Sequence, residues 1–293
     1  MVWPASSAER DRFVLERRPA RPALDPWRIQ GVTVDDEPGP TGERHAVATF
    51  FLTGRECPWR CAMCDLWQHT ITADTPPTAI PRQIADGCRV LSERGGGVTR
   101  VKLYNAGSFF DPRAVPETDY PAIATALRGF RRVIVESHPA LVGARTVRFQ
   151  RLLAPTLEVA IGLETAHPDA LARLHKRMDV PSFEAAAATL RACGIRLRVF
   201  LLIAPPFVPA GEQDDWLRRS IDIAIGAGAS VISLIPTRTG NGTLEALALE
   251  GLFQAPTVES ITRSVALARA HAGRRAVLLL DPWNGTGIDR ALA

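Results

Sequence analysis

From residue 45 onward, segments with β-strand character alternate regularly with segments that have helical character. Strand followed by helix, repeated along a chain, predicts a parallel sheet joined by right-handed crossovers. Several strands, such as Leu197–Ile203, are apolar runs without alternation, as expected for a sheet covered on one face and filled on the other. Six or seven such units favour an α/β fold of the partial (β/α)6 TIM-barrel type, mostly parallel, over a flat doubly wound sheet.

The expected strands are His45–Thr53, Thr99–Tyr104, Arg132–Glu136, Leu157–Leu163, Leu197–Ile203, Val231–Pro236 and, as an extra C-terminal strand, Ala276–Asp281. The expected helices are Ile80–Ser92, Tyr120–Arg128, Pro139–Leu153, Pro168–Leu174, Ser182–Cys193, Trp216–Ala227 and Thr257–His271.

Two parts of unequal size are expected. Residues 1–44 are rich in Pro and Arg and irregular, with a helical pattern at Ser7–Arg17 and an apolar patch around Trp27–Val34. We interpret them as a short N-terminal extension. Residues 45–293 form the barrel with its C-terminal strand and tail.

Composition narrows the class of protein. The first dozen residues lack the apolar core of a secretory signal, and no run approaches the about 18 apolar residues of a membrane span. The formal net charge of +4 fits an anionic substrate or a nucleic acid only weakly. Three of the five cysteines fall within eight residues, which indicates metal ligation in a reducing compartment, so we expect a cytoplasmic protein without membrane association.

The clustered cysteines are Cys57, Cys61 and Cys64, spaced CxxxCxxC directly after the first expected strand. Three thiolates can each bind one iron of a 4Fe-4S cluster, which leaves one iron open, whereas a ferredoxin supplies four cysteines for each cubane. A structural zinc site also needs four ligands, and His69 is the residue that could complete one. An iron-sulfur electron carrier or sensor and a zinc-stabilised nucleic-acid-binding protein are therefore alternatives.

Polar residues follow the later strands, where barrels place their chemistry. The second strand runs into Asn105, Gly107 and Ser108, and Gly107 permits close backbone approach. Glu136 and Glu164 end the third and fourth strands, so their carboxylates are candidates to accept hydrogen bonds from ribose hydroxyls or an amino group. Either carboxylate could instead pair with an arginine.

The cysteine spacing after the first barrel strand resembles the signature of the radical S-adenosylmethionine superfamily. Further blocks are similar to the branch containing archaeosine synthase and the elongator catalytic subunit. They are Gly107–Pro112, Val135–Pro139, and Ile161–Thr165 followed by Lys176–Met178.

The resemblance implies an enzyme in which the open iron chelates S-adenosylmethionine. One electron then cleaves the C5′–S bond, and the 5′-deoxyadenosyl radical abstracts a substrate hydrogen. Met63 stands where many members carry an aromatic residue against adenine. The resemblance also implies that backbone around Asn105, Gly107 and Ser108 binds the methionine amino group, and that Arg177 approaches its carboxylate.

Partners follow from the same resemblance. The expected reductant is a flavodoxin or ferredoxin-like protein, and the substrate is a tRNA nucleoside or a small metabolite. We expect a monomer or homodimer. No motif marks a catalytic residue or the outcome after hydrogen abstraction.

Overall fold

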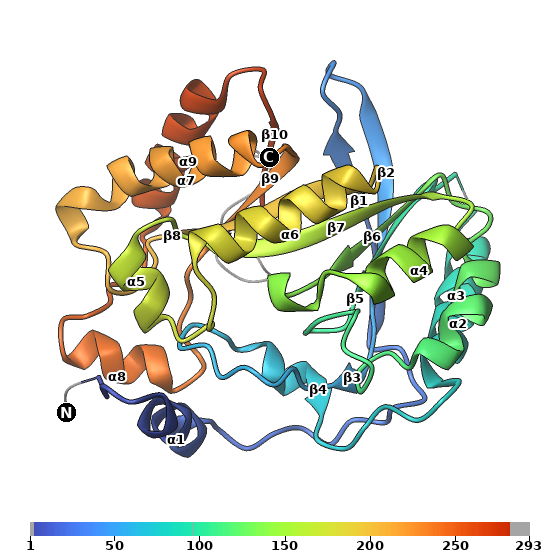
Figure 1. Ribbon diagram of the computed structural model, residues 1–293, viewed down its shortest axis with the longest axis horizontal. Coiled ribbons are helices and arrows are strands. Elements are labelled where there is room, and N and C mark those ends of the chain that lie inside the picture. Colours follow the sequence, from blue (N-terminus) through green and yellow to red (C-terminus); the bar gives the residue numbers. More distant parts are fainter. Residues whose placement is uncertain (1–2, 96, 282–293) are drawn as a thin grey trace.

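A curved eight-stranded sheet organises the computed structural model, which describes residues 3–95 and 97–281 (Figure 1). The strand order is β1-β2-β5-β6-β7-β8-β9-β10, so β1 and β10 are the two edges. Neighbours from β2 to β10 pair parallel, and β1 pairs antiparallel with β2. The prediction of a partial, mostly parallel barrel with an extra C-terminal strand is confirmed.

The strands of this sheet are β1 (Gly31–Pro38), β2 (Arg44–Phe51), β5 (Arg100–Tyr104), β6 (Arg132–Glu136), β7 (Thr156–Glu164), β8 (Arg196–Ile203), β9 (Ala229–Pro236) and β10 (Val277–Leu280). A separate small sheet pairs β3 (Gly54–Arg55) with β4 (Thr70–Ile71). The helices are α1 (Ser7–Arg17), α2 (Ala79–Glu93), α3 (Tyr120–Ala126), α4 (Ala144–Leu152), α5 (Pro168–Arg173), α6 (Val180–Ala192), α7 (Gln213–Gly226), α8 (Thr243–Leu249) and α9 (Val258–Ala272), with short 3₁₀ helices at Leu66–His69, Glu117–Asp119, Pro139–Leu141 and Ala210–Glu212.

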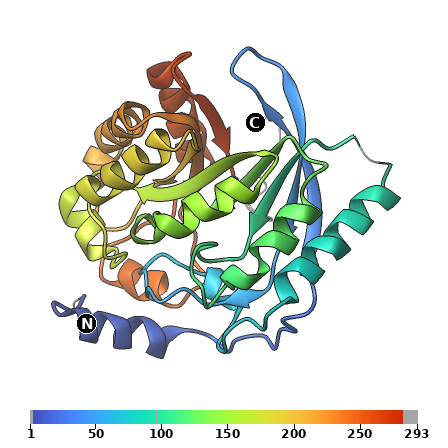
Figure 2. The ribbon, with the colours of Figure 1, turned by 45° about the vertical axis from the view of Figure 1, so that its right-hand side comes forward.

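Most helices, including α2, α4, α6 and α7, lie along the outer face of the curved sheet, whereas α1 and α8 lie together at one end of it (Figures 1 and 2). Outward-facing strand residues such as Leu103 and Val133 belong to the main core together with Ile84 of α2 and Ile123 of α3. Among the residues the structure describes, none of the helices combines the length and the apolar character that a bilayer span requires.

Several elements differ from the expectations, besides the short strands β3 and β4. The expected helix Pro139–Leu153 is divided, because the chain is extended at Val142 and Gly143 before α4 begins. Strand β1 lies where only an apolar patch was expected, and α8 was not expected at all. The boundary at residue 44 between extension and barrel stays a prediction, although β1 ties the extension to the sheet.

The amino end of the barrel is filled by buried charges. The Arg198 guanidinium donates to Glu37 at 3.0 and 2.8 Å and to Glu158 at 2.7 Å. Lys102 also pairs with Glu37, at 2.5 Å, and Arg132 pairs with Glu158 at 3.2 Å. Burial alone would raise the pKa of Glu37, but the charges of Arg198 and Lys102 lower it to about 2. Buried ion pairs therefore fill the amino end of the barrel. A ligand would have to bind at the opposite end, where the strands have their carboxyl ends.

Candidate functional site

The cysteine loop, residues 57–64, follows β2 and β3 at the carboxyl end of the sheet. Cys61 is buried, and Cys57 and Cys64 are half-buried. The Ala62 N–H donates to the Leu174 carbonyl at 2.9 Å, which ties the loop to the end of α5. The loop is thus held by barrel segments far away in the sequence.

The three thiols form one electrostatic group. Burial raises the pKa of Cys61 well above its ordinary value, and the neighbouring Cys64 and Cys57 raise it further. Burial and then Cys57 raise the pKa of Cys64 to about 12. Buried thiols that raise one another's pKa ionise readily only beside strong positive charge, which bound metal provides.

Three cysteine side chains are the donors that a cluster with one open corner would need. Within residues 3–95 and 97–281, no three His, Cys, Asp or Glu side chains are placed to hold one metal ion. A cubane is less demanding, because each thiolate binds a different iron. His69, the fourth ligand of the zinc alternative, lies with its Nδ1 3.2 Å from Gln30 Oε1.

Trp59, inside the cysteine loop, stacks on His138 at the end of β6. The ring centroids are 3.6 Å apart and the planes differ by 14°. His138 Nδ1 accepts the Ala140 N–H at 3.1 Å, so Nε2 carries the proton that points to the Lys176 carbonyl at 2.9 Å. Burial and the Lys176 charge lower the pKa of His138 to about 4. At neutral pH His138 is therefore a neutral platform that fixes the loop.

The turn after β5 lies against the first cysteine. A Cβ added at Gly107 would lie 3.5 Å from the Cys57 Cβ and 3.7 Å from Asn105 Nδ2. Asn105 is fully buried, and neither atom of its amide group has a hydrogen-bond partner among the described residues. A buried amide without partners is costly. This turn is therefore suited to binding a polar ligand beside Cys57.

Glu136 reaches the same turn from β6. Its carboxylate accepts the Gly107 N–H at 3.3 Å. Burial raises the pKa of Glu136 to about 7, although backbone N–H groups of the turn lower it. The expected neighbour Ser108 makes internal contacts instead, since its Oγ lies 3.0 Å from Ser137 Oγ and accepts the His138 N–H at 3.2 Å.

Glu164 ends β7 with a left-handed backbone (φ 68°) and pairs with Lys176. The Lys176 Nζ lies 2.5 Å from Glu164 Oε1 and also 2.5 Å from the Gly162 carbonyl. The alternative of a basic partner for Glu164 is therefore observed, with lysine in place of arginine. A side chain at position 162 would overlap both charged groups, so the pair occupies space that only glycine leaves.

Sequence reasoning passed over Lys176 in favour of its neighbour. Arg177 donates to Asp11 Oδ2 at 2.7 Å, and its side chain is 46% exposed. Lys176 is buried, and its charge acts on Cys57, Cys61 and Glu136. The sequence did show three consecutive basic residues, His175, Lys176 and Arg177. The backbone at His175 and Arg177 is left-handed, and this local conformation determines that the Lys176 side chain is the one that points inward.

The structure therefore brings together Asn105, Gly107, Glu136, Glu164 and the cysteine loop, and it gives Arg177 a different partner. Met63 is half-buried and packs against the main core. The roles of all these residues as ligands stay predictions.

No family model matches the chain. A curated relative, archaeosine synthase subunit beta of Methanosarcina acetivorans, is 32% identical over 198 residues, which cover 65% of this chain and 56% of the relative. The chain thus spans about half the length of the curated relatives it matches.

Two solved structures share the fold. A radical SAM methyltransferase from Sphaerobacter thermophilus superposes with a TM-score of 0.56 at 17% identity, over 90% of this chain and 80% of the other. The Elp3 of Methanocaldococcus infernus superposes with a TM-score of 0.52 at 13% identity, over 69% of this chain and 52% of the other. At these identities the likeness shows the fold.

Proposed function

We propose that this chain is an enzyme of the radical S-adenosylmethionine superfamily with a 4Fe-4S cluster on Cys57, Cys61 and Cys64, as the archaeosine synthase relative and the shared fold support. S-adenosylmethionine would bind beside the cluster, and the radical made from it would act on a further substrate. Such a cluster supplies one-electron reductive cleavage of S-adenosylmethionine.

The observation that carries the proposal is the turn of Asn105 and Gly107 beside Cys57. It offers an unpartnered buried amide and a close backbone approach next to a thiol of the cysteine loop. S-adenosylmethionine brings an ammonium, a carboxylate and ribose hydroxyls, which are groups that an amide and a carboxylate can bind.

Each residue of the site has a binding or orienting task in this proposal. Glu136 accepts hydrogen bonds from an amino group or ribose hydroxyl, and a positively charged ligand lowers the pKa of its carboxyl group. The Lys176–Glu164 pair keeps a cation near the cysteines and Glu136. Trp59 and His138 hold the loop against β6 and exclude water from that side.

The substrate is proposed only as a class. The name of the archaeosine synthase relative favours a tRNA nucleoside over a small metabolite. A flavodoxin or ferredoxin-like protein is proposed as the electron donor, and dithionite replaces it in the assay below.

The test is anaerobic reconstitution with iron and sulfide, followed by dithionite and S-adenosylmethionine. We expect about four irons per chain and release of 5′-deoxyadenosine, with and without added tRNA. Replacing Cys57, Cys61 or Cys64 by Ala should abolish cleavage, whereas Cys193→Ala, at the end of α6, should leave both readouts unchanged. Full cleavage in any of the three variants would refute the ligand assignment. An intact cluster that releases no 5′-deoxyadenosine under either condition would refute the activity.

A further inference from the structure

The N-terminal strap, defined as residues 3–21, crosses the carboxyl end of the barrel beside the cysteine loop (Figures 1 and 2). It contains α1 and is anchored by buried aromatic packing. The Trp3 ring lies 5.2 Å from Phe13 and 5.4 Å from Phe207, measured between centroids. At its other end, a side chain at Gly242 would overlap the Arg17 carbonyl oxygen, so the strap is closely seated.

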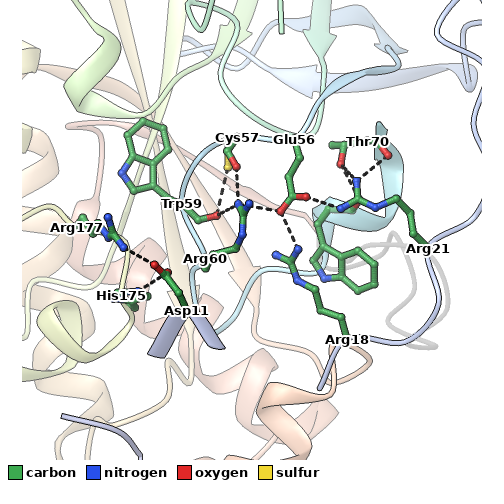
Figure 3. Close-up of polar contacts among 11 residues, drawn as sticks. Asp11, Arg18, Arg21, Glu56, Cys57, Trp59, Arg60, Thr70, His175 and Arg177 are labelled. Atoms are coloured by element: carbon green, nitrogen blue, oxygen red, sulfur yellow. Dashed lines mark hydrogen bonds and ion pairs between the residues drawn. The ribbon is translucent and has the colours of Figure 1, made fainter. Parts of the chain in front are cut away.

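The strap grips the cysteine loop through Glu56, the residue directly before Cys57 (Figure 3). The Arg18 Nη1 donates to Glu56 Oε1 at 2.8 Å, and Arg21 pairs with the other carboxylate oxygen. Arg60 approaches the same carboxylate at 3.0 Å from within the loop. Three guanidinium groups thus converge on one carboxylate whose side chain is only 10% exposed.

The loop backbone is fixed by the same network. The Arg60 Nη1 donates to the carbonyls of Cys57 at 2.8 Å and Trp59 at 3.1 Å. The Arg18 guanidinium also lies over the Trp67 ring, 4.7 Å from its centroid. Glu56 therefore connects the strap to the backbone that presents the first cysteine.

A second set of hydrogen bonds joins the strap to the turn that carries Lys176. Asp11 of α1 accepts from His175 Nε2 at 2.8 Å and from Arg177 at 2.7 Å (Figure 3). Arg10 donates to the Ala172 carbonyl at 3.1 Å. The strap thus fixes both the cysteine loop and the segment that places a buried cation beside it.

An ordinary surface ion pair would contribute little. Glu56 differs because it and Arg18 are both about nine-tenths buried, and because its partners come from both the strap and the loop. Such outer contacts orient ligands.

We propose that Glu56 is a positioning residue through which the N-terminal strap holds Cys57 in the geometry that ligates the cluster. This inference rests on the proposed function. In this proposal the strap does not move during the reaction, and its role is to hold the cysteine loop in place.

The test compares Glu56→Gln with Glu117→Gln. Glu117 is a matched control, because it is a carboxylate that pairs with two arginines, Arg145 and Arg148, outside the cysteine loop. Arg21→Gln is the milder second variant, since it removes one of the three guanidinium groups. Thermal unfolding of each metal-free protein verifies that it folds.

The first readout needs no cluster. In metal-free protein, alkylation of Cys57 by iodoacetamide, followed by mass spectrometry, should be faster in both Glu56→Gln and Arg21→Gln than in Glu117→Gln, with Cys193 unchanged as an internal reference. Burial and the charge of Glu56 raise the pKa of Cys57. Because the two substitutions remove charges of opposite sign, acceleration in both variants reports lost positioning and not the lost charge. The second readout uses the reconstituted protein. Loss of the cluster to a chelator should be roughly ten- to hundredfold faster in Glu56→Gln, and the electron paramagnetic resonance spectrum of the reduced cluster should change.

The outcomes separate the two proposals. If wild-type protein takes up a cluster but Glu56→Gln matches Glu117→Gln in alkylation and chelation, the strap inference is overturned. If Cys57 alkylation responds as expected while wild-type protein takes up no iron and sulfide, the positioning role of Glu56 is supported and the proposed function is refuted.

Discussion

Gly162→Ala is the substitution for which the structure makes the sharpest prediction. The new methyl group would overlap Glu164 Oε1 and Lys176 Nζ. Neither group can easily retreat, since Lys176 also donates to the Gly162 carbonyl and the two side chains are only 9% and 11% exposed. The substitution therefore breaks a buried ion pair.

The magnitude follows from two opposing effects. Breaking a buried pair lowers the free energy of unfolding by about 3–5 kcal/mol. Replacing Gly by Ala at an unstrained position raises it by about 0.4–1 kcal/mol through the unfolded chain. We therefore expect a net loss of roughly 2–4 kcal/mol, measured by urea unfolding of metal-free protein with tryptophan fluorescence.

The control is the same substitution at Gly226 in α7, where an added Cβ has nothing within 4 Å. Gly226→Ala should stabilise the protein by about 0.5–1 kcal/mol. In a Glu164→Ala/Lys176→Ala background the methyl group at position 162 has room. Gly162→Ala should then lower the free energy of unfolding hardly at all. If Gly162→Ala costs the same free energy with and without the pair, overlap with the pair is not the cause of the cost.

Two further predictions concern buried charges. Glu136→Gln should raise the free energy of unfolding of metal-free protein at pH 8 by up to about 3 kcal/mol and change it little at pH 4. The Glu136 carboxyl group ionises above pH 4.5 in the unfolded chain but only near its pKa of about 7 in the folded protein. The native protein therefore loses stability as pH rises through that interval. Equal gains in the free energy of unfolding at pH 4 and pH 8 would contradict this. Arg198→Met should cost about 3–5 kcal/mol at pH 7, because it leaves Glu37 and Glu158 buried without their shared cation. Without the Arg198 charge, burial raises the pKa of Glu37, so that cost should shrink toward pH 3 as Glu37 takes up a proton. A pH-independent cost in thermal unfolding would count against the ion-pair account.

The barrel was predictable because its signals are local. The capped amphipathic segment Ser7–Arg17 coincides with α1, whose N-cap Ser6 and Glu9 form a capping box. Strand β6 coincides with the expected Arg132–Glu136. Apolar runs bounded by helical patterns place such strands well.

The elements that differ depend on tertiary context. Strand β1 reads Gly-Val-Thr-Val-Asp-Asp-Glu-Pro, which carries little apolar signal, and it is held by antiparallel pairing with β2. The short α8 contains Leu244 and Leu247 at helical spacing, a signal that was available and not used.

The sequence predicted at which strand ends the site residues lie. It did not predict which side chains point into the site. Cys57, Gly107 and Glu136 meet because parallel strands bring their carboxyl ends to one edge. The choice between Lys176 and Arg177 depends on left-handed backbone at non-glycine residues, which residue type alone does not reveal.

The contacts that seat α1 join positions that leave the ribosome at very different times. Asp11 meets partners 164 and 166 residues later in the chain, and Arg10 meets one 162 residues later. With 11 residues, α1 is shorter than the about 12–15 at which isolated helices become even marginally stable. At about 5–20 residues per second, the cysteines are therefore made on the order of ten seconds before α1 can dock. During this interval of synthesis, the cysteines exist without the helix that lies at the same end of the barrel in the folded protein.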